Sequence, residues 1–462
     1  MSFLEKLFPG SKDYEPNSLG KTWTLGLQHA FAMSCATILV PLLTGLDVGV
    51  ALFSAGAGTL LFHLITRGKM PTFLGSSFSF IAALCGIIGN DAFGATKTEQ
   101  ISAAMGGIII AGVIYVIISL VIKAFGSRFI DRVFPPVVRG VGITIIGLNL
   151  SVSAINNIQS NNGFEMFSSG YVWSWCLALF VCILTIVLSS YGKGMVKMAS
   201  IFISLVIGYV VTLIFVKAGV APQGLMDFSG LAEQGRGLAR AVFEIPKFTF
   251  PSFNGRAIAM IAPIAIVTCV EHIGDVYANS AVVGRDFMKD PGLHRTMLGD
   301  GVATILAGFI GGPSNTTYSE NTAVLATTGN YNPSAIRAAA VIAIAVSFIG
   351  KAIGAIETMP NCILGGSCIV LYGMISSVGL RTLVENHVDF TKNRNLSIAA
   401  VMLVLAIGGA TIGGHLFSFS GIGLGIIAGI ILNAVLPVKT PDGKEKLIAH
   451  SVPEDEIIEE KK

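Results

Sequence analysis

Long apolar segments separated by short polar loops dominate the pattern of this chain. A span across a bilayer takes about 20 apolar residues, and fourteen segments approach or reach that length. They lie near 23–43, 48–66, 70–89, 103–124, 134–152, 171–190, 196–216, 256–279, 297–311, 313–329, 334–356, 360–380, 396–412 and 418–437. The ninth and tenth are nearly fused, so thirteen is the main rival count. The pattern predicts an all-α polytopic membrane protein with fourteen transmembrane segments.

The composition supports this interpretation. Only 12% of the 462 residues are charged and 53% are hydrophobic, whereas soluble domains are about 25% charged. The net charge of +3 is too small and too scattered for a nucleic-acid binder. The seven cysteines fall in apolar stretches without CxxC spacing, so we expect neither a disulfide framework nor a metal site.

The distribution of basic residues predicts the orientation. If the N-terminus is cytoplasmic, the short outer loops hold only Lys97 and Lys351. The inner loops then hold Arg67, Lys69, Lys123, Arg128, Arg132, Lys193, Lys197, Arg285, Lys289, Arg295, Arg337, Arg381, Lys392 and Arg394. Because Lys and Arg gather in cytoplasmic loops, we expect both termini in the cytoplasm.

The two halves of the chain resemble each other weakly. Three features recur in the same order: Gln28-His29 with Glu271-His272, Pro71 with Pro313, and Pro135 and Gly140 with Pro360 and Gly365. Seven segments per half is an odd number, so the second half would run inverted. Inverted repeats with interrupted helices at mid-membrane are the build of secondary transporters. Chance similarity among glycine-rich segments is the alternative.

Ionisable residues within apolar segments are costly and mark functional sites by default. Those noted here are His29, His63, Arg139, Glu271, His272, Asp275 and Glu320. Glu271 and Asp275 lie one helical turn apart on one face. Their repulsion means that at least one should hold a proton readily, which suits proton coupling. A polar network between helices is the alternative.

Two segments carry polar runs where a lipid-facing helix would not tolerate them. Residues 313–321 are almost wholly polar, and Gly75-Ser76-Ser77 is the counterpart in the third segment. Unwound backbone lining a cavity would tolerate such runs. We therefore predict that segments 3 and 10 are interrupted and offer free backbone N–H groups to a ligand. Phe78 would lie against a planar ligand or simply pack.

A long ordered set of motifs resembles the nucleobase–ascorbate transporter family, also called the nucleobase–cation symporter-2 family, and within it the bacterial uracil permeases. The motifs are Gln28-His29, the runs 36–41 and 74–78, Phe134-Pro135-Pro136, and the runs 271–274, 290–295 and 315–321. The resemblance covers about residues 20–437.

The resemblance implies a core domain that carries substrate and a gate domain that often forms a homodimer. The implied divisions are a cytoplasmic N-terminal segment (1–22), core (23–124 and 256–356), gate (134–216 and 360–437), an extracytoplasmic loop (217–255) and a cytoplasmic tail (438–462).

By position, Glu271 and Glu320 resemble the uracil-binding carboxylates. Phe78 and Ser319 match positions with ring and backbone contacts. Tyr318 and Tyr372 match pocket-side tyrosines, and His29 matches the histidine of the first segment. We assign proton coupling to Asp275, Glu271 and His29.

Two residues depart from the pattern of uracil permeases. Asp275 stands where those proteins commonly have His and resembles the xanthine and urate branch, and Ala323 replaces a Gly. Glu320 is the pyrimidine-like choice, and it carries more weight because it is the expected direct contact.

These residues predict a proton-coupled importer of a nucleobase, with uracil as the favoured substrate, in the cytoplasmic membrane of a bacterium. It would not be an enzyme and would use no cofactor beyond the coupling proton. A purine permease, sodium coupling and uniport stay open. An anion exchanger is disfavoured because Glu271 and Glu320 would repel an anion.

Overall fold

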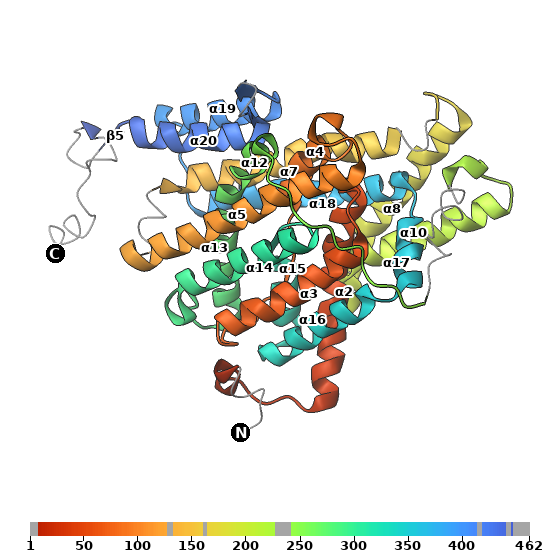
Figure 1. Ribbon diagram of the computed structural model, residues 1–462, viewed down its shortest axis with the longest axis horizontal. Coiled ribbons are helices and arrows are strands. Elements are labelled where there is room, and N and C mark those ends of the chain that lie inside the picture. The colour runs from red at the N-terminus through yellow and green to blue at the C-terminus, as the bar shows by residue number, and fades with distance from the viewer. Residues whose placement is uncertain are drawn as a thin grey trace.

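The computed structural model describes residues 8–126, 133–159, 164–226, 242–413, 418–439 and 445–446, and most of these residues are helical (Figure 1). The longer helices are α2 (Leu19–Thr44), α3 (Val48–Ile65), α5 (Lys97–Phe125), α7 (Pro136–Gln159), α8 (Ser169–Tyr191), α10 (Ser200–Lys217), α13 (Ile264–Val283), α14 (Leu293–Ile310) and α18 (Asn361–Glu385). The shorter helices are α4 (Ile81–Ile87), α9 (Met195–Met198), α12 (Gly255–Ile261), α15 (Ser319–Thr328), α16 (Pro333–Ser347), α17 (Gly350–Glu357), α19 (Asn393–Ile407) and α20 (Gly421–Val435). Helical turns are η1 (Pro9–Asp13), η2 (Phe78–Phe80), η3 (Asp91–Phe93), η5 (Gln223–Leu225) and η7 (Met288–Gly292). The strands are β1 (Leu74–Ser76), β2 (Asn315–Thr317), β3 (Thr411–Gly413), β4 (Ser418–Ser420), β5 (Val438–Lys439) and β6 (Glu445–Lys446).

Each predicted apolar segment coincides with one helix, with two consecutive helices, or with a helix and a short strand. In the described part of the chain, eight helical stretches are long and apolar enough to cross a membrane, α12 and α13 together forming one of them. Four more apolar helices are shorter: 78–87, α16, α19 and α20. The expectation of a wholly α-helical chain is wrong in one respect, because six short strands form three antiparallel pairs among the described residues.

Local sequence explains where the helices end. Gly45 closes α2 in the left-handed conformation, with φ 77°, and Asp47 begins α3 by accepting a hydrogen bond from the Val50 N–H at 2.9 Å. Pro263 separates α12 from α13, because a proline inside a helix lacks one backbone donor. The predicted segment 256–279 therefore comprises two helices, which meet at Ala262 and Pro263.

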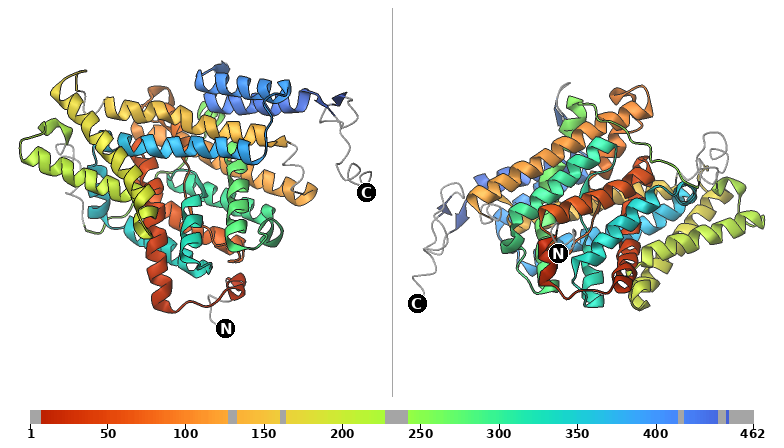
Figure 2. Two further views of the ribbon diagram at one scale, coloured as in Figure 1. Left: turned by 180° about the vertical axis from the view of Figure 1, so that it is seen from behind. Right: turned by 60° about the horizontal axis from the view of Figure 1, so that its bottom comes forward.

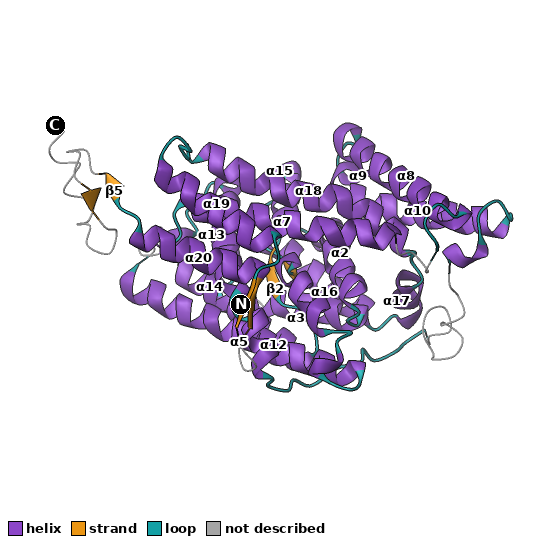
Figure 3. Cartoon of the chain, turned by 90° about the horizontal axis from the view of Figure 1, so that it is seen from above, coloured by secondary structure: helices purple, strands orange, loops and turns teal. Residues whose placement is uncertain are grey.

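Glycines let the helices approach closely. α5 packs on α14, and a Cβ at Gly112 would lie 2.8 Å from the Gly301 carbonyl oxygen. α7 packs on α18, where a Cβ at Gly379 would lie 2.4 Å from the Thr144 nitrogen. Small residues at such crossings are typical of membrane helices. In Figures 2 and 3, α19 and α20 lie together at the C-terminal end, while α8 and α10 flank the opposite end.

The strands β1 and β2 pair with each other near the middle of the molecule (Figure 3). Leu74 faces Thr317 and Ser76 faces Asn315, and every residue of both strands is buried. The chain continues from β1 through η2 into α4 and from β2 into α15. The two predicted interruptions therefore exist, and they are joined to each other.

An extended segment, residues 242–254, follows a different course from the helices. Its backbone bonds to the ends of three neighbours: Glu244 N–H to the Phe348 carbonyl (3.0 Å), Thr249 N–H to Ile310 (3.2 Å) and Ser252 N–H to Ser102 (2.8 Å). The predicted loop 217–255 is thus bound to the molecule over its second part.

Candidate functional site

The carboxylates of α13 are hydrogen-bonded to both interruptions. Ser79, which follows β1, donates to Glu271 at 3.3 Å, and Thr317 of β2 donates to Asp275 at 2.7 Å. Glu271 and Asp275 are only partly buried, one helical turn apart. The geometry brings two predicted acids to the paired strands.

Glu320 lies in the first turn of α15, directly after the second interruption. A helix N-terminus favours a carboxylate there because its free N–H groups carry partial positive charge. Glu320 lines a cavity of about 30 Å³ between α2, the start of α10 and α18. The other lining residues are Phe31, Ala32, Ala36, Ala199, Ile201, Phe202 and Leu371. A cavity of this size holds about one or two water molecules and is too small for a larger ligand.

Two aromatic pairs involve residues next to these acids: Phe78 precedes Ser79, which donates to Glu271, and Phe31 and Phe202 line the cavity of Glu320. Phe78 meets Tyr372 of α18 edge to face, with ring centroids 6.4 Å apart and planes at 76°. Phe31 of α2 meets Phe202 of α10 at 6.0 Å. Phe78 is half-buried, whereas Tyr372 is only 1% exposed. The first pair brings together two residues that the sequence placed in one pocket.

His29 contacts α15 through the residue next to Glu320. Its Nδ1 lies 3.1 Å from Asn321 Nδ2, which also donates to the His29 carbonyl at 3.1 Å. This double contact ties α2 to α15. His29 is buried, and its contacts with Asn321 connect it to the candidate site.

Tyr318 and Ser319 are placed differently from each other. Tyr318 is 4% exposed, and its hydroxyl donates to the Ser76 carbonyl at 2.9 Å and accepts from Thr37 at 3.4 Å. It therefore fastens the two interruptions together. The side chain of Ser319 is exposed.

Asp300 of α14 is an acid that the sequence analysis missed. It lies 2.9 Å from His272 Nδ1, and both side chains are fully buried. Asp300 falls within the apolar segment 297–311, so the rule that found Glu271 applied to it as well. The pair ties α13 to α14 beside the candidate site.

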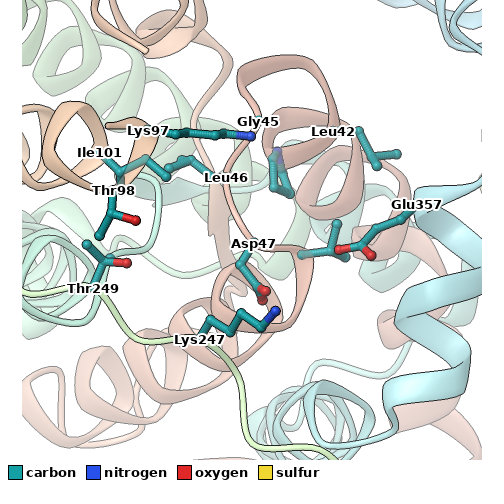
Figure 4. Close-up of a pocket in the computed structure, with 13 residues that line it drawn as sticks. Leu42, Gly45, Leu46, Asp47, Lys97, Thr98, Ile101, Lys247, Thr249 and Glu357 are labelled. Atoms are coloured by element: carbon teal, nitrogen blue, oxygen red, sulfur yellow. The ribbon is translucent and has the colours of Figure 1, made fainter. Parts of the chain in front are cut away.

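A larger cavity of about 440 Å³ lies elsewhere, at the turn between α2 and α3 (Figure 4). Asp47, Lys97, Lys247 and Glu357 line it, and it contains none of the predicted site residues. In the described ranges, no three His, Cys, Asp or Glu side chains gather so as to hold a metal ion. We therefore place the candidate site at the paired strands, where acids and aromatic rings meet.

Comparisons with known proteins agree on one family. The permease family matches residues 20–414. The uracil permease of Bacillus caldolyticus is 41% identical over 438 residues, covering 93% of this chain and 95% of that protein. The uracil permease of Bacillus subtilis is 40% identical (90% and 92% covered), and the putative pyrimidine permease RutG of Escherichia coli is 37% identical (94% and 93%).

Solved structures share the fold at low sequence identity. Murine Slc26a9, an anion transporter in the inward-facing state, superposes with a TM-score of 0.66 at 13% identity, covering 93% of this chain and 70% of that one. The transmembrane domain of the cyanobacterial bicarbonate transporter BicA gives 0.60 at 13%, covering 91% and 98%. This multi-pass membrane protein therefore belongs to the permease family of the nucleobase–ascorbate transporters, whose members are transporters and not enzymes.

Proposed function

We propose that the protein is a proton-coupled symporter that imports a nucleobase, uracil, by alternating access. One observation carries the proposal: α13 places two carboxylates in hydrogen-bond contact with both interruptions, and a third carboxylate begins the helix after the second. The uracil permeases among its relatives support the same substrate class.

The chemistry of the site suits a planar neutral base. Uracil has two N–H donors and two carbonyl acceptors. The carboxylates of Glu271 and Glu320 accept from the N–H groups, and the backbone N–H groups at the start of α15 donate to a carbonyl. The rings of Phe78 and Tyr372 bound the base on one side.

Movement between two domains would open and close the site. In the proposed architecture, fourteen segments form two inverted repeats of seven. The core comprises α2–α5 and α12–α17, and the gate comprises α7–α10 and α18–α20, through which two copies would associate. Phe31–Phe202 and Phe78–Tyr372 each join one core residue to one gate residue. Parting these rings would enlarge the small cavity at Glu320. Both termini would be cytoplasmic, in a bacterial cytoplasmic membrane.

Asp275 is the proposed carrier of the coupling proton, with Glu271 and His29 as partners. Thr317 donates to Asp275, so a change in the charge of Asp275 reaches the second interruption directly. Because uracil is neutral, symport with a proton carries positive charge inward. Uptake should therefore respond to the membrane potential.

Labelled uracil uptake into proteoliposomes, with and without an imposed pH gradient, tests this function. Accumulation that requires an inward proton gradient and that unlabelled uracil abolishes supports the proposal. Inhibition by xanthine but not by uracil would point to the purine alternative, which Asp275 favours. Uptake driven by sodium at constant pH, or uptake without accumulation, would overturn proton coupling.

A further inference from the structure

The ten residues Phe8–Asn17, which precede α2, lie against the ends of several helices. We call them the N-terminal clamp. Gly10 N–H donates to the Arg67 carbonyl at 2.9 Å, and the Tyr14 hydroxyl donates to the Lys69 carbonyl at 2.5 Å. Both acceptors belong to the turn that leads from α3 to β1. Residues that precede the first helix of a domain are usually poorly ordered. The contacts of Phe8–Asn17 therefore need an explanation.

The clamp also holds the C-terminal end of α13. The guanidinium of Arg285, two residues beyond the helix, lies 4.3 Å from the centre of the Tyr14 ring and 3.6 Å from the Asp13 carboxylate. It donates to the Asp13 carbonyl as well. Burial raises the pKa of Tyr14 to about 12, so its hydroxyl stays protonated and keeps donating at physiological pH.

The same segment reaches the connection between α15 and α16. The amides of Asn17 and Asn330 exchange hydrogen bonds of 3.1 and 2.8 Å. Asn332, which caps α16, donates to the Glu15 carbonyl at 2.7 Å. Phe8 is 5% exposed, and the Arg337 guanidinium lies 4.5 Å from its ring.

We infer that the N-terminal clamp positions the carboxylates of the candidate site. α13 carries Glu271 and Asp275, and α15 carries Glu320. Each helix ends two residues before a residue that contacts the clamp: α13 before Arg285, and α15 before Asn330. A segment bonded to both ends fixes the distance between the two helices and hence the spacing of their acids. Arg285 and Tyr14 are thus positioning residues that touch no substrate.

Cleavage after folding separates this role from a role in folding. A recognition sequence for a site-specific protease is inserted between Asn17 and Ser18. The full-length protein is cut after it has been reconstituted into proteoliposomes. We expect amide hydrogen exchange at residues 284–292 and 329–332 to accelerate at least tenfold. We also expect the uracil concentration for half-maximal uptake to rise severalfold, with a smaller change in maximal rate. Unchanged exchange in the cut protein would overturn the inference.

Substitution of Arg285 gives a second, independent test. Arg285→Ala should reproduce the faster exchange and the raised half-saturation, and Arg285→Lys should restore most of both, because a lysine keeps a cation near Tyr14 and Asp13. Lys289→Ala, which removes an exposed ion pair with Asp286, is the matched control and should change neither. If Arg285→Ala behaves like Lys289→Ala, the clamp does not position the site.

The transport readout rests on the proposed function, whereas the exchange readout does not. If the uncut parent takes up no uracil while cutting still accelerates exchange, the proposed substrate fails and the clamp stands. If the parent transports and cutting changes neither readout, the clamp fails and the substrate stands.

Discussion

Glu320→Gln tests whether the first turn of α15 is the substrate site. Glutamine has nearly the same shape, so it fits the cavity of about 30 Å³ without enlarging it. The anchor of α15 also survives, because it depends on the bond of Tyr318 to the Ser76 carbonyl and on the contact of Asn321 with His29. The substitution therefore changes charge and hydrogen bonding while leaving the local fold intact.

The size of the effect follows from one buried hydrogen bond. A charged hydrogen bond contributes about 1.5–3 kcal/mol, and each 1.4 kcal/mol is about tenfold in affinity. Glutamine can still accept through its amide oxygen, but only as a neutral acceptor, and rotation would present its NH₂ to a donor. We expect uracil affinity to fall by about 10-fold to 150-fold.

Calorimetric titration of uracil into purified protein, without any ion gradient, measures this affinity. Glu357→Gln is the matched control, because Glu357 lines the larger cavity at the turn between α2 and α3 (Figure 4). It should bind uracil as the parent does. If Glu320→Gln keeps the parent affinity while Glu357→Gln loses it, the site lies in the larger cavity and the assignment is refuted.

Three further predictions address the other groups of the site. Asp275→Asn should bind uracil but fail to concentrate it in proteoliposomes, because an amide cannot release a proton. Asp275→His should partly restore accumulation. Full accumulation by Asp275→Asn would remove this residue from the coupling path. Phe78→Ala should weaken binding by up to about tenfold, because an aromatic pair contributes about 0.5–1.5 kcal/mol, while the pH dependence of uptake stays as in the parent; a loss of pH dependence at unchanged affinity would contradict this role. Asp300→Ala should destabilise the protein by about 3–5 kcal/mol, because it leaves His272 buried without its partner. Thermal unfolding in detergent measures this, and Arg381→Ala, at an exposed ion pair, should unfold like the parent.

Continuous apolar segments predicted the positions of the helices well. Each apolar segment is long enough for its hydrophobicity to distinguish it from the flanking polar loops. The polar run after Pro313 predicted an interruption, and β2 lies at that place. The spacing of Glu271 and Asp275 likewise predicted one helical face, and both face the interruptions.

Other features could not be predicted from the sequence. The sequence carries no pattern that indicates the pairing of β1 with β2. Strands of three residues that are all buried show no alternation of polar and apolar positions. Tyr318 looked like a pocket residue, but whether a hydroxyl bonds substrate or backbone depends on neighbours distant in sequence. The partners of the clamp lie at the end of α3 and in the second half of the chain, and nothing in the sequence of residues 8–17 indicates them.

The pairing of β1 with β2 has a consequence for the order of folding. Leu74 contacts Thr317, so the chain must close a loop of about 240 residues before the pair can form. Contacts of such sequence separation form late, because the entropy of loop closure is lost before the contact is gained. During synthesis, the first strand is inserted long before its partner exists, with its backbone groups unpaired at the centre of the protein. The candidate site is therefore among the last parts to form, and the first half of the chain alone would lack the part of it that β2, α13 and α15 supply.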